Sequence, residues 1–167
     1  MLLYEDLITG DELFSDAYPL KLVENVAYEV DCAMITVGGD NVDIGANPSA
    51  EGGDEEVDSS SETVNNVVYS FRLSQTSFDK KSYLTYLKSY MKSVKAKLME
   101  TNPDEAAEFE KLITPYAKKI IGNFKDYDFY VGESMNPDGM VALLNYREDG
   151  VTPYFTFFKH GLKVQKL

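Results

Sequence analysis

The residue types that most often act in catalysis are scarce in this chain of 167 residues. Its single histidine, His160, lies at a predicted strand end, where a surface or turn residue is more common than a general base. Its single cysteine, Cys32, follows Asp31 in an apolar stretch, and a neighbouring carboxylate opposes formation of the reactive thiolate. The sequence contains no Cys-x-x-Cys pair and no Gly-x-x-x-x-Gly-Lys phosphate loop. We therefore expect no catalytic residues and no cofactor.

Lysines recur at helical spacing in the middle of the chain, where they could bind a partner. Four of them fall on one stripe of a predicted helix when successive residues turn by about 100°: Lys81, Lys88, Lys92 and Lys95. Residues 78–125 carry a net charge of +4, whereas the rest of the chain carries −16. This contrast favours docking of an acidic partner. A solvated helix edge is the alternative, because charged faces are ordinary on amphipathic helices.

Acidic residues dominate another part of the chain. Residues 22–71 contain 11 acidic residues and no lysine or arginine. Within them, residues 39–62 are rich in glycine, serine and carboxylates, which predicts a flexible acidic loop. Carboxylates are hard ligands suited to calcium, but Asp54, Glu55, Glu56 and Asp58 do not have the spacing of an EF-hand. We expect any calcium binding to be weak, and its ligands are unknown.

Length and composition are those of one globular domain. A content of 44% hydrophobic and 13% aromatic residues is sufficient for a single core. No run of about 18 apolar residues is present to span a bilayer, and Glu5 and Asp6 interrupt any secretory signal. The net charge of −12 opposes binding to nucleic acid. With one cysteine, the chain suits a reducing compartment. We therefore expect a cytoplasmic protein that binds neither membranes nor nucleic acid.

Two helices and several strands must position these side chains. Apolar residues spaced by 3 and 4 predict one buried face on the first helix: Leu84, Leu87, Met91, Val94 and Leu98. Asn102 and Pro103 suit the start of a second helix, so residues 78–125 are predicted to form an antiparallel hairpin. Segments rich in Val, Tyr and Phe predict strands at residues 26–37, 64–73, 126–132, 140–147 and 154–158. Asp149-Gly150 is a hairpin turn signal. Together these elements predict an α+β fold.

Two motifs lie far apart in the sequence and between them combine glycine, proline and carboxylates with aromatic residues. The first is Asn47-Pro48-Ser49-Ala50-Glu51, within the acidic loop. The second is Phe129-Tyr130-Val131-Gly132-Glu133, followed by Asp138-Gly139 before an apolar strand. These motifs resemble signatures of the translationally controlled tumour protein family. The likeness extends from residues 1–8 to residues 146–153 and so covers the whole chain. It implies one domain over residues 1–167 with a tent-like folded sheet, shared with Rab-binding chaperones and methionine sulfoxide reductases.

The resemblance also implies a function. It implies a cytosolic, non-enzymatic protein of protein synthesis that binds elongation factor 1 alpha and its exchange subunits. It further implies association with microtubules, hence partly with the cytoskeleton, and weak calcium binding. The lysines of the hairpin would then form the surface that binds the elongation factor and tubulin.

The alternative implied by the resemblance is a regulator of nucleotide exchange on a Ras-like small GTPase of the TOR pathway. The family likeness places Glu12 and Glu133 on the surface that would contact this GTPase. On the residues alone, Glu12 is a solvated carboxylate in a turn before Leu13, and Glu133 is a carboxylate at a strand end. A redox enzyme is a third possibility, which we disfavour because Cys32 has no resolving thiol.

Overall fold

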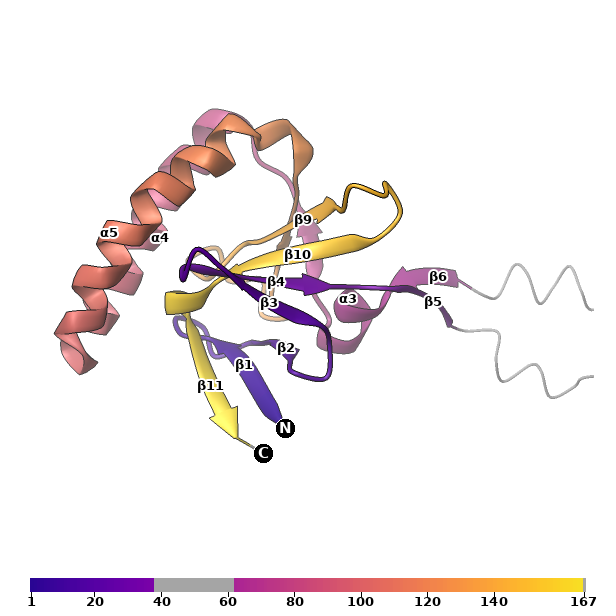
Figure 1. Cartoon of the computed structure of the whole chain (residues 1–167), viewed down its shortest axis with the longest axis horizontal. Helices are drawn as coiled ribbons and strands as arrows, with labels where there is room; N and C mark the ends of the chain where they lie inside the picture. Colours follow the sequence, from indigo (N-terminus) through magenta and orange to yellow (C-terminus); the bar gives the residue numbers. More distant parts are fainter. Residues whose placement is uncertain (38–61, 167) are drawn as a thin grey trace, which may run out of the picture.

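The computed structural model describes residues 1–37 and 62–166. A strand-rich body occupies the centre, a helical hairpin leans away from one side, and a two-stranded ribbon projects from the other (Figure 1). The two chain ends lie close together on neighbouring strands (Figure 1). The predicted α+β class with an inserted helical hairpin is confirmed.

The strands of the described residues form three sheets. The first has the order β11-β1-β2, built from Leu162–Lys166, Leu2–Asp6 and Glu12–Ser15. The second has the order β3-β4-β10-β9-β8-β7, built from Leu20–Val23, Ala27–Asp31, Pro153–Phe158, Ala142–Tyr146, Asp128–Val131 and Ser74–Thr76. The third pairs β5, Met34–Val37, with β6, Glu62–Asn65.

Aromatic side chains join the first two sheets into one core. The ring of Phe14 on β2 stacks on Tyr4 of β1, with 4.4 Å between centroids, and on Phe157 of β10, with 4.5 Å. All three side chains are buried. Stacked aromatic pairs of this kind stabilise a core beyond the area that they bury. The two sheets therefore form one folded body.

The hairpin consists of α4, Lys80–Thr101, and α5, Pro103–Gly122. Asp79 caps α4, since its carboxylate accepts a hydrogen bond from the Ser82 N–H at 2.7 Å. Asn102 caps α5 in the same way, with Pro103 in the first turn, as predicted. A short 3₁₀ turn, η1 (Phe124–Asp126), then leads back into β8.

The hairpin is held against the body by a cluster of rings. Tyr90 of α4 and Tyr116 of α5 both pack on Phe158, the last residue of β10. The next turn, η2 (Lys159–Gly161), approaches α4 so closely that a Cβ on Gly161 would overlap the Tyr90 hydroxyl. Glycine at residue 161 is therefore needed for this close contact.

The predicted buried face of α4 is only partly right. Leu87, Val94 and Leu98 are buried, but Leu84 is 39% exposed. Tyr83 and Tyr90, which are not among the residues of the predicted face, are fully buried against the body. Both tyrosines contact aromatic rings of the body. Compared with the predicted face, the buried face of α4 is therefore shifted toward its tyrosines.

Two strand predictions are wrong in part. Residues 64–73 do not form one strand: after β6, the Asn65 side chain accepts hydrogen bonds from the backbone N–H of Val67 and Val68 and begins a short helix, α3 (Asn66–Phe71). Residues 26–37 form two strands in different sheets, because the chain changes partner around Cys32. The other predicted strands correspond to β8, β9 and β10, and Asp149-Gly150 lies in the turn between β9 and β10.

Candidate binding surfaces

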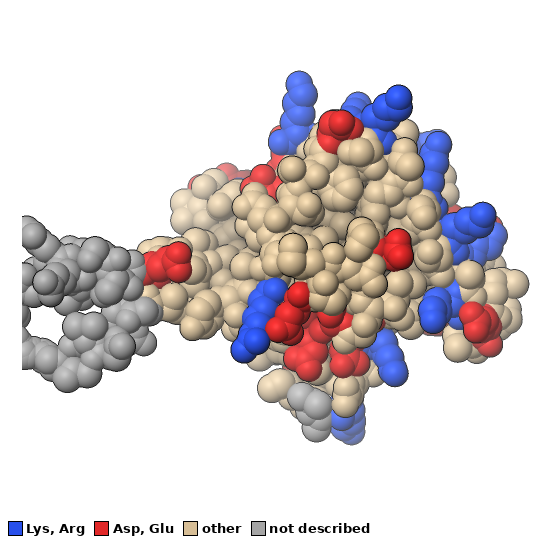
Figure 2. Space-filling view, turned by 180° about the vertical axis from the view of Figure 1, so that it is seen from behind, with Lys and Arg blue, Asp and Glu red and all other residues tan. Residues whose placement is uncertain are grey.

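The hairpin lysines lie on the side of α4 that faces away from its buried tyrosines. Lys81, Lys88 and Lys92 are exposed, whereas Lys95 is partly buried and its Nζ lies 2.6 Å from Glu110 on α5. Figure 2 shows Lys and Arg side chains gathered along the right-hand margin of the molecule, where the hairpin lies in that view. The predicted lysine stripe is therefore exposed to solvent at three of its four positions. Lys95 is its most constrained member because of its ion pair.

The acidic residues Glu12 and Glu133 come from distant parts of the chain. Glu12 is the first residue of β2, so the expectation that it lies in a turn is wrong. It pairs across the strands with Glu5, and residues directly opposite in an antiparallel pair point to the same face, which concentrates negative charge there. Glu133 lies in the turn after β8, as expected of a strand-end residue, and its carboxylate contacts Arg72 at 3.1 Å.

A hydrogen-bonded junction brings these two glutamates to one region. The Asp11 carboxylate accepts hydrogen bonds from the Ser134 hydroxyl at 2.6 Å and from the Ser134 N–H at 3.2 Å. Gly132 makes room for this contact, because a Cβ there would lie 2.5 Å from the Asp11 carboxylate. Since Asp11 precedes Glu12 and Ser134 follows Glu133, the junction brings the chain at these two glutamates close together.

Sequence reasoning missed the residues that build this junction. Asp11, Ser134 and Arg72 have no spacing in the sequence that links them, since the contacts span 123 and 61 residues. The available signal was Gly132, which precedes Glu133 in the aromatic motif. A glycine at that position is explained by the close approach of Asp11.

The buried ionisable groups do not form a catalytic arrangement in the part of the chain that the structure describes. Burial raises the pKa of Cys32 to about 11, so its thiol stays protonated at neutral pH. The expectation that His160 lies in a turn is confirmed, but it is a buried residue rather than a surface one. Burial lowers the pKa of His160, and Glu108 is the carboxylate nearest to its ring, at 3.4 Å.

Asp6 is also buried, and its role is structural. Its carboxylate accepts hydrogen bonds from the N–H of Met140 at 2.7 Å and of Ile8 at 2.8 Å. Burial raises its pKa despite these hydrogen bonds. Asp6 thereby ties the end of β1 to the segment that leads into β9.

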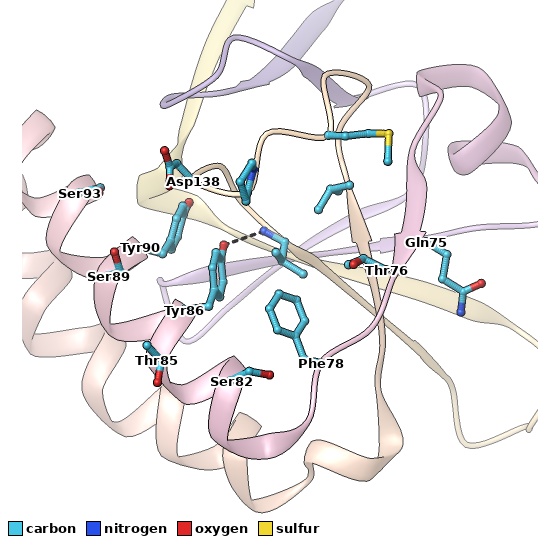
Figure 3. A pocket seen from close by; sticks show the side chains of 14 residues that line it. Gln75, Thr76, Phe78, Ser82, Thr85, Tyr86, Ser89, Tyr90, Ser93 and Asp138 are labelled. Carbon is cyan, nitrogen blue, oxygen red and sulfur yellow. Dashed lines mark hydrogen bonds between the residues drawn. The ribbon is translucent and has the colours of Figure 1, made fainter.

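A cavity of about 430 Å³ lies between α4 and the strands β7 and β8 (Figure 3). Tyr86 lines this cavity, and its hydroxyl donates to the Gly139 carbonyl at 2.6 Å and accepts from the Val141 N–H at 2.9 Å. Ser82, Ser89 and further hydroxyl residues of α4 line the rim. Among the described lining residues Asp138 is the one charged group, so the cavity does not suit a phosphate-bearing ligand.

The carboxylates of the acidic loop that could bind calcium fall in the part of the chain that the structure does not describe. Asp54, Glu55, Glu56 and Asp58 lie outside the described residues, as does the loop prediction for residues 39–61, while Glu62 begins β6. Within residues 1–37 and 62–166, no group of three or more His, Cys, Asp or Glu side chains is arranged to hold a metal ion. In the same ranges, no helix has the length and apolar character needed to cross a membrane.

Comparison with known proteins gives one consistent answer. The sequence model of the family described as translationally controlled tumour protein matches residues 1–163. The translationally-controlled tumor protein homolog of Saccharomyces cerevisiae is 63% identical over 167 residues, covering 100% of both chains.

Solved structures agree over the full length. The translationally controlled tumor-associated protein of Schizosaccharomyces pombe has a TM-score of 0.84 and 62% identity, with 100% of both chains covered. The translationally-controlled tumor protein of Caenorhabditis elegans has a TM-score of 0.73 and 30% identity, with 100% of this chain and 99% of the other covered. The chain therefore belongs to the translationally controlled tumour protein family.

Proposed function

We propose that this chain is a cytosolic, non-enzymatic interaction protein of protein synthesis that binds the elongation factor 1 complex through its hairpin. The observation that carries the proposal is the exposed stripe of Lys81, Lys88 and Lys92 on the basic hairpin of an acidic chain. Membership of the family supports the choice of partner. The protonated state of the Cys32 thiol supports the non-enzymatic part, because a redox role needs a reactive thiolate.

The charge distribution determines which surface an acidic partner meets first. Residues 78–125 carry +4 and the remainder of the chain −16. An acidic partner is therefore repelled by the body and attracted to the hairpin, which orients the encounter and raises the association rate. The same surface suits an acidic surface of tubulin, so microtubule association is proposed as a companion activity.

The test is a charge reversal on the stripe with a matched control. Lys88→Glu combined with Lys92→Glu should weaken binding of the elongation factor 1 complex by about tenfold or more, because two attractive contacts become repulsive. The control is Lys97→Glu combined with Lys166→Glu, which changes the net charge equally. Lys97 is exposed on α4 about 180° around the helix from Lys88. Equal loss in both double variants would show a non-specific charge effect and contradict the proposal.

The second candidate function is regulation of nucleotide exchange on a Ras-like small GTPase. The observation that favours it is the Asp11–Ser134 junction, which holds Glu12 and Glu133 in one region. Two exposed carboxylates in one region suit a basic partner surface.

Binding of a purified small GTPase tests this second function. Glu12→Ala and Glu133→Ala should each weaken binding, whereas Glu100→Ala and Glu148→Ala, at exposed positions elsewhere, should not. Nucleotide release should be measured with the same four variants. If Glu12→Ala and Glu133→Ala bind the GTPase as well as the unchanged protein does, both residues are ordinary solvated carboxylates. That result would contradict the second function.

A further inference from the structure

The two hairpin helices leave an apolar trough between them on their solvent-facing side. Its larger part is a cavity of about 360 Å³. Apolar side chains from both helices form most of its wall: Leu84, Leu87, Met91, Ala117 and Ile121. Lys88 on one helix and Lys118 on the other stand at its edges. Leu84 is 39% exposed, so apolar surface is open to a partner here.

A second cavity continues the trough along the hairpin. It has a volume of about 260 Å³ and shares Met91 and Thr114 with the first. Phe109 and Ile113 contribute its apolar wall. The ion pair between Lys95 and Glu110 stands at its edge. From Leu84 to Lys95 the trough follows about 16 Å of α4, the length of three helical turns.

We propose that this trough binds an amphipathic helix of a partner protein, with its apolar side chains in the trough and acidic side chains flanking them. The inference rests on the proposed role of the hairpin lysines and specifies what they bind. Lys88 and Lys92 line one edge along α4, and Lys118 stands opposite on α5. A groove with apolar walls and basic edges is complementary to a helix with an apolar stripe and acidic edges.

Two other occupants fit less well. A second copy of this hairpin would bring lysines against lysines across the interface. An anionic membrane would satisfy the lysines, but a flat lipid surface does not fill a trough set between two helices. A helix of about 10 Å diameter can lie along it and reach the apolar walls.

The probe is a synthetic peptide of about 18 residues, about 27 Å long as a helix. Leucines are spaced by 3 and 4 along one face, and glutamates flank them on both sides. One comparison peptide has the same composition in scrambled order, and another has glutamine in place of glutamate. Binding to the full chain is measured by fluorescence anisotropy at two salt concentrations.

We expect the amphipathic acidic peptide to bind and both comparison peptides to bind at least tenfold more weakly. Leu84→Ser should weaken binding by about tenfold, and Lys88→Ala with Lys118→Ala should weaken it and reduce its salt dependence. Met99→Ser and Lys97→Ala are the matched controls, at exposed positions outside the trough. Circular dichroism verifies that each variant is folded.

Equal binding of the scrambled peptide, or no effect of Leu84→Ser, would overturn the inference. Preferential binding to vesicles of anionic lipid with no binding of the peptide would also overturn it. The proposed function is tested separately with the elongation factor complex. The complex could bind in a way that depends on Lys88 and Lys92 but not on Leu84. That result would support the proposed function and contradict the role of the trough. Binding of the peptide without binding of the complex would support the role of the trough and contradict the proposed function.

Discussion

The two candidate surfaces of this molecule are built in different ways. The basic surface comes from one continuous stretch of α4, where helical geometry alone places Lys81, Lys88 and Lys92 on one side. The acidic surface needs β1, the start of β2 and the turn after β8, and it is fixed by contacts between residues 123 positions apart. We therefore expect the basic surface to tolerate changes in the body, and the acidic surface to be sensitive to changes at its junction.

The two surfaces also differ in how firmly they are supported. The hairpin packs on the body through buried rings, including Tyr90 and Tyr116 against Phe158. The acidic surface is supported mainly by exposed hydrogen bonds and by the exposed ion pair of Arg72 with Glu133. Exposed ion pairs contribute about 0–1 kcal/mol, far less than buried aromatic packing.

The largest expected effect is at the contact between hairpin and body. Phe158→Ala should lower the free energy of unfolding by about 3–5 kcal/mol, because it removes a buried ring that two tyrosines cover. Urea unfolding followed by circular dichroism measures the loss. A change below about 1 kcal/mol would mean that the hairpin does not depend on this packing.

A smaller effect is expected at the junction of the acidic surface. Gly132→Ala would place a Cβ 2.5–2.9 Å from side-chain atoms of Asp11, and overpacking of this kind costs about 1–3 kcal/mol. The control is Gly122→Ala, where a Cβ would meet nothing within 4 Å. Urea unfolding of both variants should show a loss for Gly132→Ala alone. Equal stability of the two would show that Asp11 moves aside freely.

The pH dependence of stability should report on His160, which lies between the hairpin and the body. Burial lowers its pKa in the folded state, so the unfolded chain binds a proton more readily. Stability should therefore fall as the pH drops through the ordinary histidine range near 6.5 and below it. Glu108, 3.4 Å away, acts in the opposite direction and reduces the effect.

Urea midpoints at pH 7.5 and 5.5 measure this dependence. The difference should be smaller in His160→Gln, which has no titrating ring. A direct measurement of the His160 titration by NMR is the second check. A folded-state pKa above the ordinary value would reverse the sign and contradict the account.

The smallest expected effect is on the exposed lysines. Lys88→Glu with Lys92→Glu should change the free energy of unfolding by no more than about 0.5 kcal/mol per substitution, as is usual for surface positions. Lys95→Glu should cost somewhat more, because it replaces the ion pair with Glu110 by two like charges. A large loss in the double variant would mean that these lysines support the fold rather than a partner.

Local patterns predicted the hairpin well, and the reason is physical. The spacing of Leu87, Val94 and Leu98 and the caps at Asn102 and Pro103 act within a few residues, so the sequence contains the whole signal. The rotation of α4 toward Tyr83 and Tyr90 was not predictable, because it depends on which rings of the body are present to receive them.

The acidic surface shows why the rest could not be predicted. Resemblance to a family singled out Glu12 and Glu133, but no local pattern connects Asp11 to Ser134. The strand predicted at residues 64–73 is wrong for a different, local reason. The side chain of Asn65 caps a helix, and that hydrogen bond outweighs the strand preference of the valines that follow.

The most direct test of the account measures two partners against two variants. The elongation factor 1 complex and a purified small GTPase are each titrated against Lys88→Glu/Lys92→Glu and against Glu12→Ala/Glu133→Ala at fixed salt. The account predicts that the first variant loses the elongation factor complex and keeps the GTPase, and that the second does the reverse, because separated sites act independently. Loss of both partners in either variant, with the fold intact, would contradict the claim that the hairpin and the body carry separate surfaces.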